Sequence, residues 1–388
     1  MPAKDYILKE EPYLISLRRW FHANPEPSLQ EYETCKKIAA ELSSYGVEYE
    51  YVGETAIAAT IKGAKPGKII ALRADTDALN MDDLKTTPYA SKNKGCCHAC
   101  GHDAHTAALL AAAKVLKEKQ DLLCGEVRLF FQPAEEIGQG ARLFINAGLM
   151  KDVWRVFALH ITSRIESGKV SLTPGPQSAG CDYFKIQVTG KGTHVSTPEK
   201  GVDALYTAAQ IVNNLQSIVS RNTSALDTVV VGVGHLTAGT QYNIVAEHAV
   251  LEGTTRTFTH EIREATNNKV CKIATETAAL FGATATVEFK QFALPLINHA
   301  EVAAETYPIA AGIVGAENII TNNEKALGAD DFADFLALAP GLYAHVGTRS
   351  SSVPNSETSH HHGLFDIDEK ALVTCCALYV EFALWALG

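Results

Sequence analysis

Metal-binding side chains follow directly after three apolar stretches that have the pattern of buried strands. IIALRADTDAL carries Asp75 and Asp77, VRLFFQPAEE ends in Glu135 and Glu136, and RVFALH ends in His160. Ligands in open α/β sheets bind outside the carboxyl ends of the strands, so we expect these side chains to meet in one crevice. Carboxylate and imidazole groups gathered in this way favour a divalent-metal site, and hydrolysis is the first chemistry to consider there.

The segment GCCHACGHDAHTAALLAAAKVL adds further ligand types at the start of an alanine-rich helix. It places Cys100, His102, Asp103 and His105 within six residues. A thiolate is a soft ligand that suits zinc. A single histidine or glutamate at a strand end is as often a satisfied polar group or a helix cap, but several strands that end in ligand-type residues together favour a metal centre. The spacing of Cys97 and Cys100 is also that of a redox dithiol, although no other thioredoxin feature accompanies it.

The adjacent pair Glu135 and Glu136 suggests a division of labour. Neighbouring residues on an extended segment point to opposite sides. One carboxylate could therefore bind metal while the other stays free as a general base. The alternative is a solvated acidic pair at the start of a helix, where negative charge suits the helix dipole.

Other candidate residues lie later in the chain. Three consecutive histidines, residues 360–362, precede GLFDIDEK. His194 lies on a glycine-rich loop after a predicted strand. Asn243 and Arg256 lie on predicted strands and are candidate carbonyl and anion binders.

The order of predicted elements indicates an α/β protein with two domains. Strands and helices alternate in the first half of the chain, which predicts a mostly parallel sheet covered by helices. Between the proline-bearing segments 173–176 and 293–296 the predicted order is β-α-β-β-α-β, typical of a ferredoxin-like α+β sandwich. The α/β pattern then resumes. We therefore predict a discontinuous catalytic domain over 1–177 and 293–388, with an inserted domain over 178–292.

Composition narrows the function classes. A chain of 388 residues favours more than one core, and 34 basic against 44 acidic residues give a net charge of −10 that repels nucleic acid. No apolar run is long enough to span a membrane, and the first residues lack the apolar core of a secretory signal. Nine cysteines, single or in adjacent pairs, form a poor disulfide framework. We expect a cytoplasmic protein that binds neither nucleic acid nor membrane.

Several motifs together resemble a known enzyme family. They are RRWFHANPEPSLQE, ALRADTDAL, HACGHDAHTAALLAAA, FFQPAEE, FALHI, GKGTHVSTP, GTQYNIVAE, GTTRTF and HHHGLFDIDE, in this order. The chain resembles the amidohydrolase branch of the aminoacylase and carboxypeptidase-G superfamily of metallohydrolases, which includes N-acyl-amino-acid amidohydrolases, hippurate hydrolases and auxin-conjugate hydrolases. The resemblance spans nearly the whole chain, and HACGHDAHT and QPAEE are its most specific motifs. It implies a zinc-peptidase-like catalytic domain and an inserted domain that serves as lid and dimerisation domain.

The resemblance also implies a set of metal ligands. Cys100 matches the bridging thiolate, and the terminal ligands would be His102, Glu136, His160 and His361. His361 is preferred to its two neighbours because it lies four residues before Phe365, as the family's ligand does.

Catalytic and binding roles follow from the same resemblance. Glu135 matches the general base, and Asp77 matches a carboxylate that orients a ligand. His194 resembles a lid histidine that steadies the oxyanion. Asn243 and Arg256 resemble substrate-binding groups, with Arg256 on the substrate carboxylate. The chain departs from the family pattern at Asn80, usually proline, and at Asp330, usually glutamate.

The resemblance implies hydrolysis with two divalent metal ions per subunit. Zn²⁺ is expected from the cysteine ligand, with Mn²⁺, Co²⁺ or Ni²⁺ as alternatives. We expect cleavage of the amide bond of N-acetyl or N-aryl-acyl amino acids by a metal-bridged water, with release of the free amino acid. A dipeptidase or aminopeptidase with the same two-metal site is the alternative. A non-catalytic zinc site is disfavoured because Glu135 would stand beside it as a free base. The expected partners are a small N-acyl amino acid or short peptide and further copies of the chain, as a homodimer or homotetramer.

Overall fold

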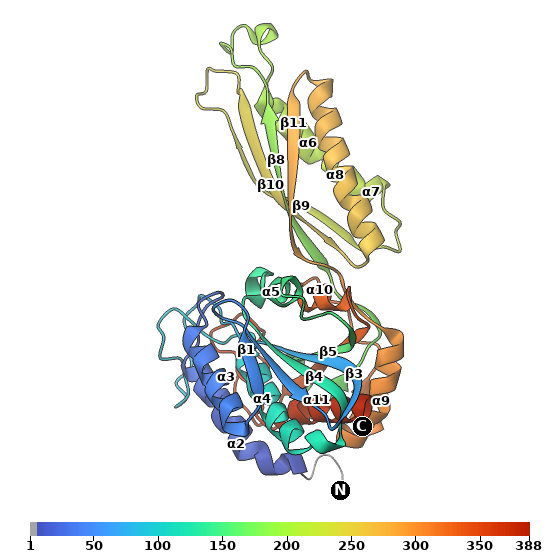
Figure 1. The fold of residues 1–388 in the computed structure, drawn as a ribbon. Coiled ribbons are helices and arrows are strands. Elements are labelled where there is room, and N and C mark those ends of the chain that lie inside the picture. Colours follow the sequence, from blue (N-terminus) through green and yellow to red (C-terminus); the bar gives the residue numbers. More distant parts are fainter. Residues whose placement is uncertain (1–5) are drawn as a thin grey trace. The chain divides into compact units, whose positions relative to one another are not determined.

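The computed structural model describes residues 6–388, so the first five residues of the segment compared with a secretory signal lie outside it. The chain forms two compact units. The first comprises Met1–Gly175, Asn298–Glu324 and Asp330–Gly388, and the second comprises Pro176–Ile297 and Lys325–Ala329. Figure 1 shows both units with their helices and strands.

A mixed eight-stranded sheet forms the centre of the first unit. Its order is β1-β2-β4-β3-β5-β14-β6-β13. The middle strands β4, β3, β5 and β14 run parallel to their neighbours in this group, whereas β1 and β2 form an antiparallel edge. The strands are β1 (Glu48–Tyr51), β2 (Ile57–Lys62), β3 (Lys65–Asp75), β4 (Cys124–Gln132), β5 (Val153–Glu166), β6 (Val170–Ser171), β13 (Ile319–Ile320) and β14 (Gly341–Arg349).

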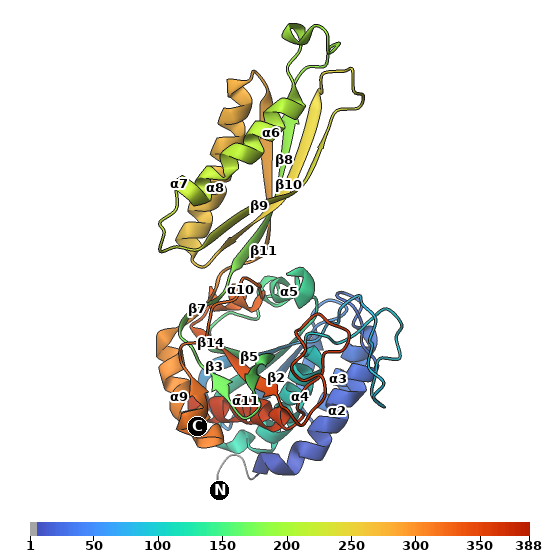
Figure 2. The same cartoon turned by 180° about the vertical axis from the view of Figure 1, so that it is seen from behind.

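Helices cover both faces of this sheet, which confirms the predicted α/β class (Figure 2). Helices α4 (His102–Glu118) and α11 (Ala371–Leu387) pack on one face, flanked by α2 (Glu11–Ala23), α3 (Tyr32–Tyr45) and α9 (Ala300–Val314). The short helices α5 (Gly140–Asn146) and α10 (Phe332–Leu336) pack together on the other face. Small side chains let α4 lie close to the sheet and to α11, so nearly all of α4 is buried.

The second unit has the predicted ferredoxin-like pattern. Its antiparallel sheet has the order β11-β8-β10-β9, and helices pack on one face of it. Along the chain the order is β-α-β-β-α-β, with a short helix α7 (Ser217–Arg221) after the first helix. The elements are β8 (Gly180–Thr189), α6 (Ala204–Leu215), β9 (Val229–Ala238), β10 (His248–Thr257), α8 (His260–Leu280) and β11 (Thr284–Ala293).

Two short strands, β7 (Gly175–Ser178) and β12 (Leu296–Asn298), pair with each other where the chain passes from one unit to the other. None of the helices within residues 6–388 has the length and apolar character needed to cross a bilayer.

Candidate metal centre and catalytic site

The parallel strands of the first unit bring the expected site residues to one edge of the sheet. Strand β3 ends at Asp75, which pairs in register with Gln132 at the end of β4. Helix α4 begins at His102, after Gly101 with φ 94°. A Cβ at position 101 would lie 2.4 Å from the side chain of Ile161, so glycine alone fits this turn.

His160 lies within β5 and not at its end, contrary to the prediction. Strand β5 continues to Glu166 because β14 pairs with it as far as Arg349. The other edge of β5 has no partner in β3 beyond Ala158, because the pairing between β3 and β5 ends there. The side chain of His160 therefore borders the open edge beyond β3.

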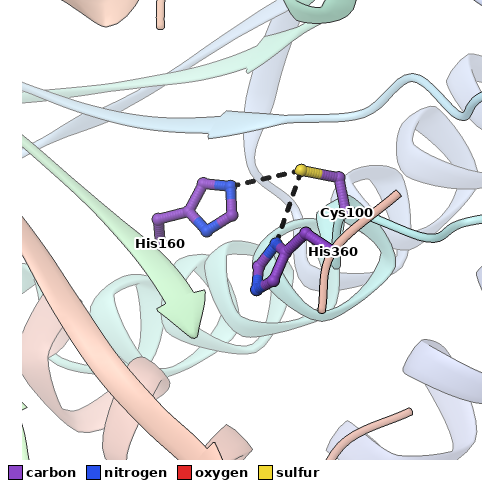
Figure 3. Close-up of side chains that lie close together, drawn as sticks. All are labelled: Cys100, His160 and His360. Atoms are coloured by element: carbon purple, nitrogen blue, oxygen red, sulfur yellow. Dashed lines mark hydrogen bonds between the residues drawn. The ribbon is translucent and has the colours of Figure 1, made fainter. Parts of the chain in front are cut away.

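Two groups of metal-ligand types share Cys100. In one, the Cys100 Sγ lies 3.6 Å from His160 Nε2 and 3.7 Å from His360 Nδ1 (Figure 3). In the other, Cys100, His102 and Glu136 each offer a ligand atom, and these atoms lie within 4.8 Å of one another. A sulfur common to two groups fits a thiolate that bridges two cations.

The histidine run contributes two residues to this centre. His361 Nε2 lies 3.3 Å from Glu136 Oε1, whereas His360 faces Cys100. His362 is exposed and accepts a hydrogen bond from the backbone of Leu364. Sequence reasoning passed over His360, although the run itself was its signal. The choice of His361 as the metal ligand stays a prediction.

The orientation of His102 fits a bound cation. Its Nδ1 faces the backbone carbonyl of Asp77 at 2.9 Å and Asp77 Oδ1 at 3.2 Å. These acceptors hold a proton on Nδ1 and leave Nε2 as the nitrogen available to a cation. That Nε2 is buried and has no hydrogen-bond partner among residues 6–388. A buried imidazole nitrogen held in this way is suited to ligate a metal.

Glu135 and Glu136 do not continue strand β4, so the extended-segment interpretation was wrong. The strand ends at Gln132, Ala134 has a left-handed backbone (φ 56°), and Glu135–Ile137 forms a 3₁₀ turn. Both carboxylates consequently approach His102 Nε2, at 3.9 Å for Glu135 and 4.0 Å for Glu136. The turn is thus able to supply a ligand and a base to the same place.

The centre is strongly negative. Burial and the charges of Glu136 and Glu135 raise the pKa of Cys100 well above its usual range. Burial would lower the pKa of His102, but the charges of Asp75 and Asp77 raise it to about 10. Burial and then the charge of Asp330 raise the pKa of Glu135. Divalent cations would relieve this accumulation of charge and stabilise the thiolate.

Both ring nitrogens of His105 have hydrogen-bond partners, so this residue holds neighbouring groups in place and offers no unpaired nitrogen to a metal. Its Nδ1 lies 2.6 Å from Asp75 Oδ1, and its Nε2 accepts a hydrogen bond of 2.9 Å from the Ile161 backbone. His160 is held similarly, because its Nδ1 lies 2.6 Å from the Ile161 carbonyl oxygen and its Nε2 is turned to Cys100.

A buried arginine network behind the site was not predicted. Arg73 donates to Asp75 at 2.6 Å, to Asp330 at 3.2 Å and to Asp331 at 3.1 Å. Carboxylate oxygens of Glu135, Asp330 and Asp331 lie within 4.8 Å of one another. Asp330, which stands where the family usually has glutamate, therefore still places a carboxylate beside Glu135. An arginine in the middle of an otherwise apolar strand was the signal in the sequence.

The redox alternative is disfavoured by the surroundings of Cys97. Its Sγ lies 3.9 Å from Lys85 Nζ, whereas Cys100 is turned to the histidines. Burial raises the pKa of Cys97 to about 12. A reactive dithiol needs a lowered thiol pKa.

The three remaining candidates lie on the second unit, where Asn243 lies in a turn between β9 and β10 and not on a strand as predicted. His194 is exposed, and the next residue, Val195, donates a backbone hydrogen bond of 3.1 Å to the carbonyl of Asn243. Arg256 lies on β10 and its Nη1 donates to the carbonyl of Leu327 at 3.4 Å. Their roles toward a substrate stay predictions.

Thiol, imidazole and carboxylate side chains at the edge of the parallel strands, with an extra carboxylate beside them, are the residue types of a metal-dependent hydrolase. Residues 71–385 match the model of the peptidase family M20/M25/M40, and the chain belongs to this family.

Its relatives agree with that membership. The chain is 38% identical to N-acetylcysteine deacetylase of Bacillus subtilis, over 96% of this chain and 97% of the relative. It is also 38% identical to thermostable carboxypeptidase 2 of Saccharolobus solfataricus, over 95% and 94%. The crystal structure of a dinuclear metal-binding M20 peptidase from Bacillus subtilis superposes with a TM-score of 0.84 at 34% identity, covering 97% of this chain and 98% of that one.

These findings confirm three predictions from the sequence. The chain belongs to the amidohydrolase branch of the family, it has the expected α/β fold with a separate antiparallel sheet, and it is a metallohydrolase of amide or peptide bonds.

Proposed function

We propose that the protein hydrolyses the amide bond of N-acyl amino acids, with acetyl or aryl-acyl groups, and releases the free amino acid. The observation that carries this proposal is the turn at residues 134–137. It sets Glu135 beside Glu136 at the edge where Cys100, His102 and His160 gather. A relative named N-acetylcysteine deacetylase, similar over nearly the whole chain, supports an acylated amino acid as substrate.

We assign the binding of two divalent ions to five residues: Cys100, His102, Glu136, His160 and His361. The sulfur shared by two groups of ligand types and the free Nε2 of His102 support this assignment. The thiolate favours Zn²⁺. When bound, such ions polarise a carbonyl group and lower the pKa of water.

Glu135 acts as the general base in this proposal. It takes a proton from the attacking water and later delivers it to the nitrogen of the leaving amine. Burial and the charge of Asp330 raise the pKa of Glu135, and the two proposed cations would favour its ionised form, which can accept a proton. Asp77 holds the Nδ1 proton of His102 and the backbone N–H of Glu136 and thereby fixes two ligands at once.

Residues of the second unit complete the assignment. His194 stabilises the oxyanion that develops at the carbonyl. Asn243 and Arg256 bind the substrate, with the guanidinium on its carboxylate. A lid and dimerisation role for the second unit, assembly as a homodimer or homotetramer and a cytoplasmic location belong to the same proposal.

A peptide substrate is the second candidate. A relative named thermostable carboxypeptidase 2, at 38% identity, favours it. A dipeptidase or aminopeptidase would use the same metal centre and differ in the groups that surround the substrate.

A substrate panel tests the proposal. The purified protein is incubated with N-acetyl-amino acids, N-benzoyl-amino acids and dipeptides, each with added Zn²⁺, Mn²⁺, Co²⁺ or Ni²⁺, and the released amine is measured. We expect the acylated amino acids to give the higher kcat/KM. Faster hydrolysis of dipeptides would favour the peptidase, and no hydrolysis of either class would refute the proposal.

A further inference from the structure

The loop between helices α2 and α3 contacts the turn that carries Glu135. Glu31, at the end of this loop, is fully buried. Its Oε1 accepts a hydrogen bond of 2.9 Å from the backbone N–H of Ala134. Asp77 Oδ2 accepts a second bond, of 3.1 Å, from the backbone N–H of Glu136. Carboxylates therefore hold the backbone on both sides of Glu135.

The turn needs such support because its backbone is unfavourable. Ala134 has φ 56°, a left-handed conformation in which the Cβ crowds the following carbonyl. The alanine carbonyl accepts a further bond of 3.1 Å from the backbone of Gln139. Conformations of this kind persist where surrounding contacts over-determine them. Without the bond to Glu31, relaxation of Ala134 would displace the next residue, Glu135.

We propose that Glu31 is a positioning residue, which acts through the Ala134 N–H to set the place of Glu135. The proposal rests on the general-base role given to Glu135 above. In this role Glu31 needs a side chain long enough to place an acceptor oxygen at the Ala134 N–H. A negative charge on that side chain is not needed.

The surroundings of Glu31 agree with a neutral group there. Burial and the charge of Asp77 raise the pKa of Glu31 to about 8. Its second oxygen, Oε2, has no hydrogen-bond partner within residues 6–388. A glutamine could keep its carbonyl oxygen on Ala134 and turn its amide towards the negative charge of Asp77.

Two mild substitutions separate reach from charge. Glu31→Gln keeps the length and removes the ionisable carboxyl group, whereas Glu31→Asp keeps a carboxyl group and shortens the side chain by one methylene. We expect Glu31→Gln to retain kcat. We expect Glu31→Asp to lower kcat by about ten- to a hundredfold with little change in KM, because misplacing a catalytic group by about 1 Å costs up to this factor.

A matched control lies in the same loop. Glu26 caps helix α3 by accepting from the backbone N–H groups of Glu33 (3.1 Å) and Thr34 (2.8 Å). Its side chain has no hydrogen bond to the turn among the described residues. Glu26→Asp makes the same shortening and should leave kcat unchanged.

Amide hydrogen exchange supplies a readout that needs neither metal nor substrate. In the metal-free protein, Glu31→Asp should speed exchange of the Ala134 amide by about tenfold, the factor that one lost hydrogen bond to a carboxylate gives. Glu31→Gln and Glu26→Asp should leave this amide protected.

The outcomes separate this inference from the proposed function. Wild-type kcat and wild-type amide exchange in Glu31→Asp would overturn the inference, as would Glu31→Gln being as impaired as Glu31→Asp. If the wild-type protein hydrolyses no substrate of the panel, the proposed function fails, while the exchange measurement still decides whether Glu31 holds the turn.

Discussion

Replacing Asp77 with asparagine should weaken metal binding, because its carboxylate contacts two of the proposed ligands, His102 and Glu136. Asp77 Oδ1 lies 3.2 Å from His102 Nδ1. Asp77 Oδ2 accepts from the Glu136 backbone at 3.1 Å and from Ser28 Oγ at 2.7 Å. Asparagine offers only one acceptor oxygen, so Asp77→Asn cannot satisfy both sides.

The size of the effect follows from which bond is lost. His102 keeps the backbone carbonyl of residue 77 at 2.9 Å in the variant, so the loss falls mainly on Glu136. A hydrogen bond to a charged group contributes about 1.5–3 kcal/mol. This corresponds to a Kd that rises about 10- to 150-fold. Carboxylates that orient metal-binding histidines typically affect metal affinity by about 10- to 100-fold, in agreement with this estimate.

Competition with a zinc-chelating indicator measures this change in the metal-free protein at constant pH and salt. Ser28→Ala is the matched control, because it removes one neutral donor to Asp77 and leaves the carboxylate. Its Kd should rise about fivefold or less. A Kd for Asp77→Asn equal to that of the wild type, in a folded protein, would refute the view that Asp77 positions the ligands.

Three further predictions concern catalysis, folding and pH. Glu135→Gln should lower kcat by about 10²–10⁴-fold, while elemental analysis should still find two metals per chain. Near-normal turnover of this variant would exclude Glu135 as the general base. Arg18→Met should reduce the free energy of unfolding, measured in urea, by about 3–5 kcal/mol. The reason is that the buried Arg18 guanidinium lies 2.9 Å from carboxylate oxygens of both Asp103 and Asp366. A loss below about 1 kcal/mol, which is what an exposed ion pair contributes, would contradict this prediction. The pKa of Glu31 is raised to about 8 in the folded protein, whereas it is about 4.3 in an unfolded chain. Between these two pH values the folded state binds more protons than the unfolded state, so the free energy of unfolding falls as pH rises. The metal-free wild type should therefore lose up to about 1.4 kcal/mol per pH unit relative to Glu31→Gln from pH 5 to 7, and parallel unfolding curves would show that no such shift exists.

The sequence predicted the architecture because its signals are local and periodic. Apolar runs that end in ligand-type residues marked β3, β4 and β5, and proline-bearing connections marked the unit with the second sheet. Parallel pairing of β3 with β4 places the ends of these two strands together, and the pairing of β3 with β5 stops at Ala158, two residues before His160. The residues expected to bind metal at this edge follow from that pairing.

Contacts made by side chains from distant segments could not be read in the same way. Arg73 reaches Asp330 and Asp331 across more than 250 positions of sequence. Glu31 reaches Ala134 across 103 positions. Neither partner has a residue type or spacing that indicates the other. Hydrogen bonds of this kind become visible only when the packing of the sheet and helices is known.

Backbone strain at the site was equally hidden, and it explains why the two glutamates lie as they do. Ala134 and His361 have φ 56° and 62°, although only a few per cent of non-glycine residues adopt a positive φ. Each such residue costs of order 1–3 kcal/mol, which a folded protein tolerates only where other contacts enforce it. At Ala134 the enforcing contacts are Glu31 and Gln139, and at His361 a backbone hydrogen bond to Ala99 contributes. An extended chain would have sent Glu135 and Glu136 to opposite sides, whereas the strained turn brings both within 4.0 Å of His102. A ligand and a base from adjacent residues can therefore serve one centre.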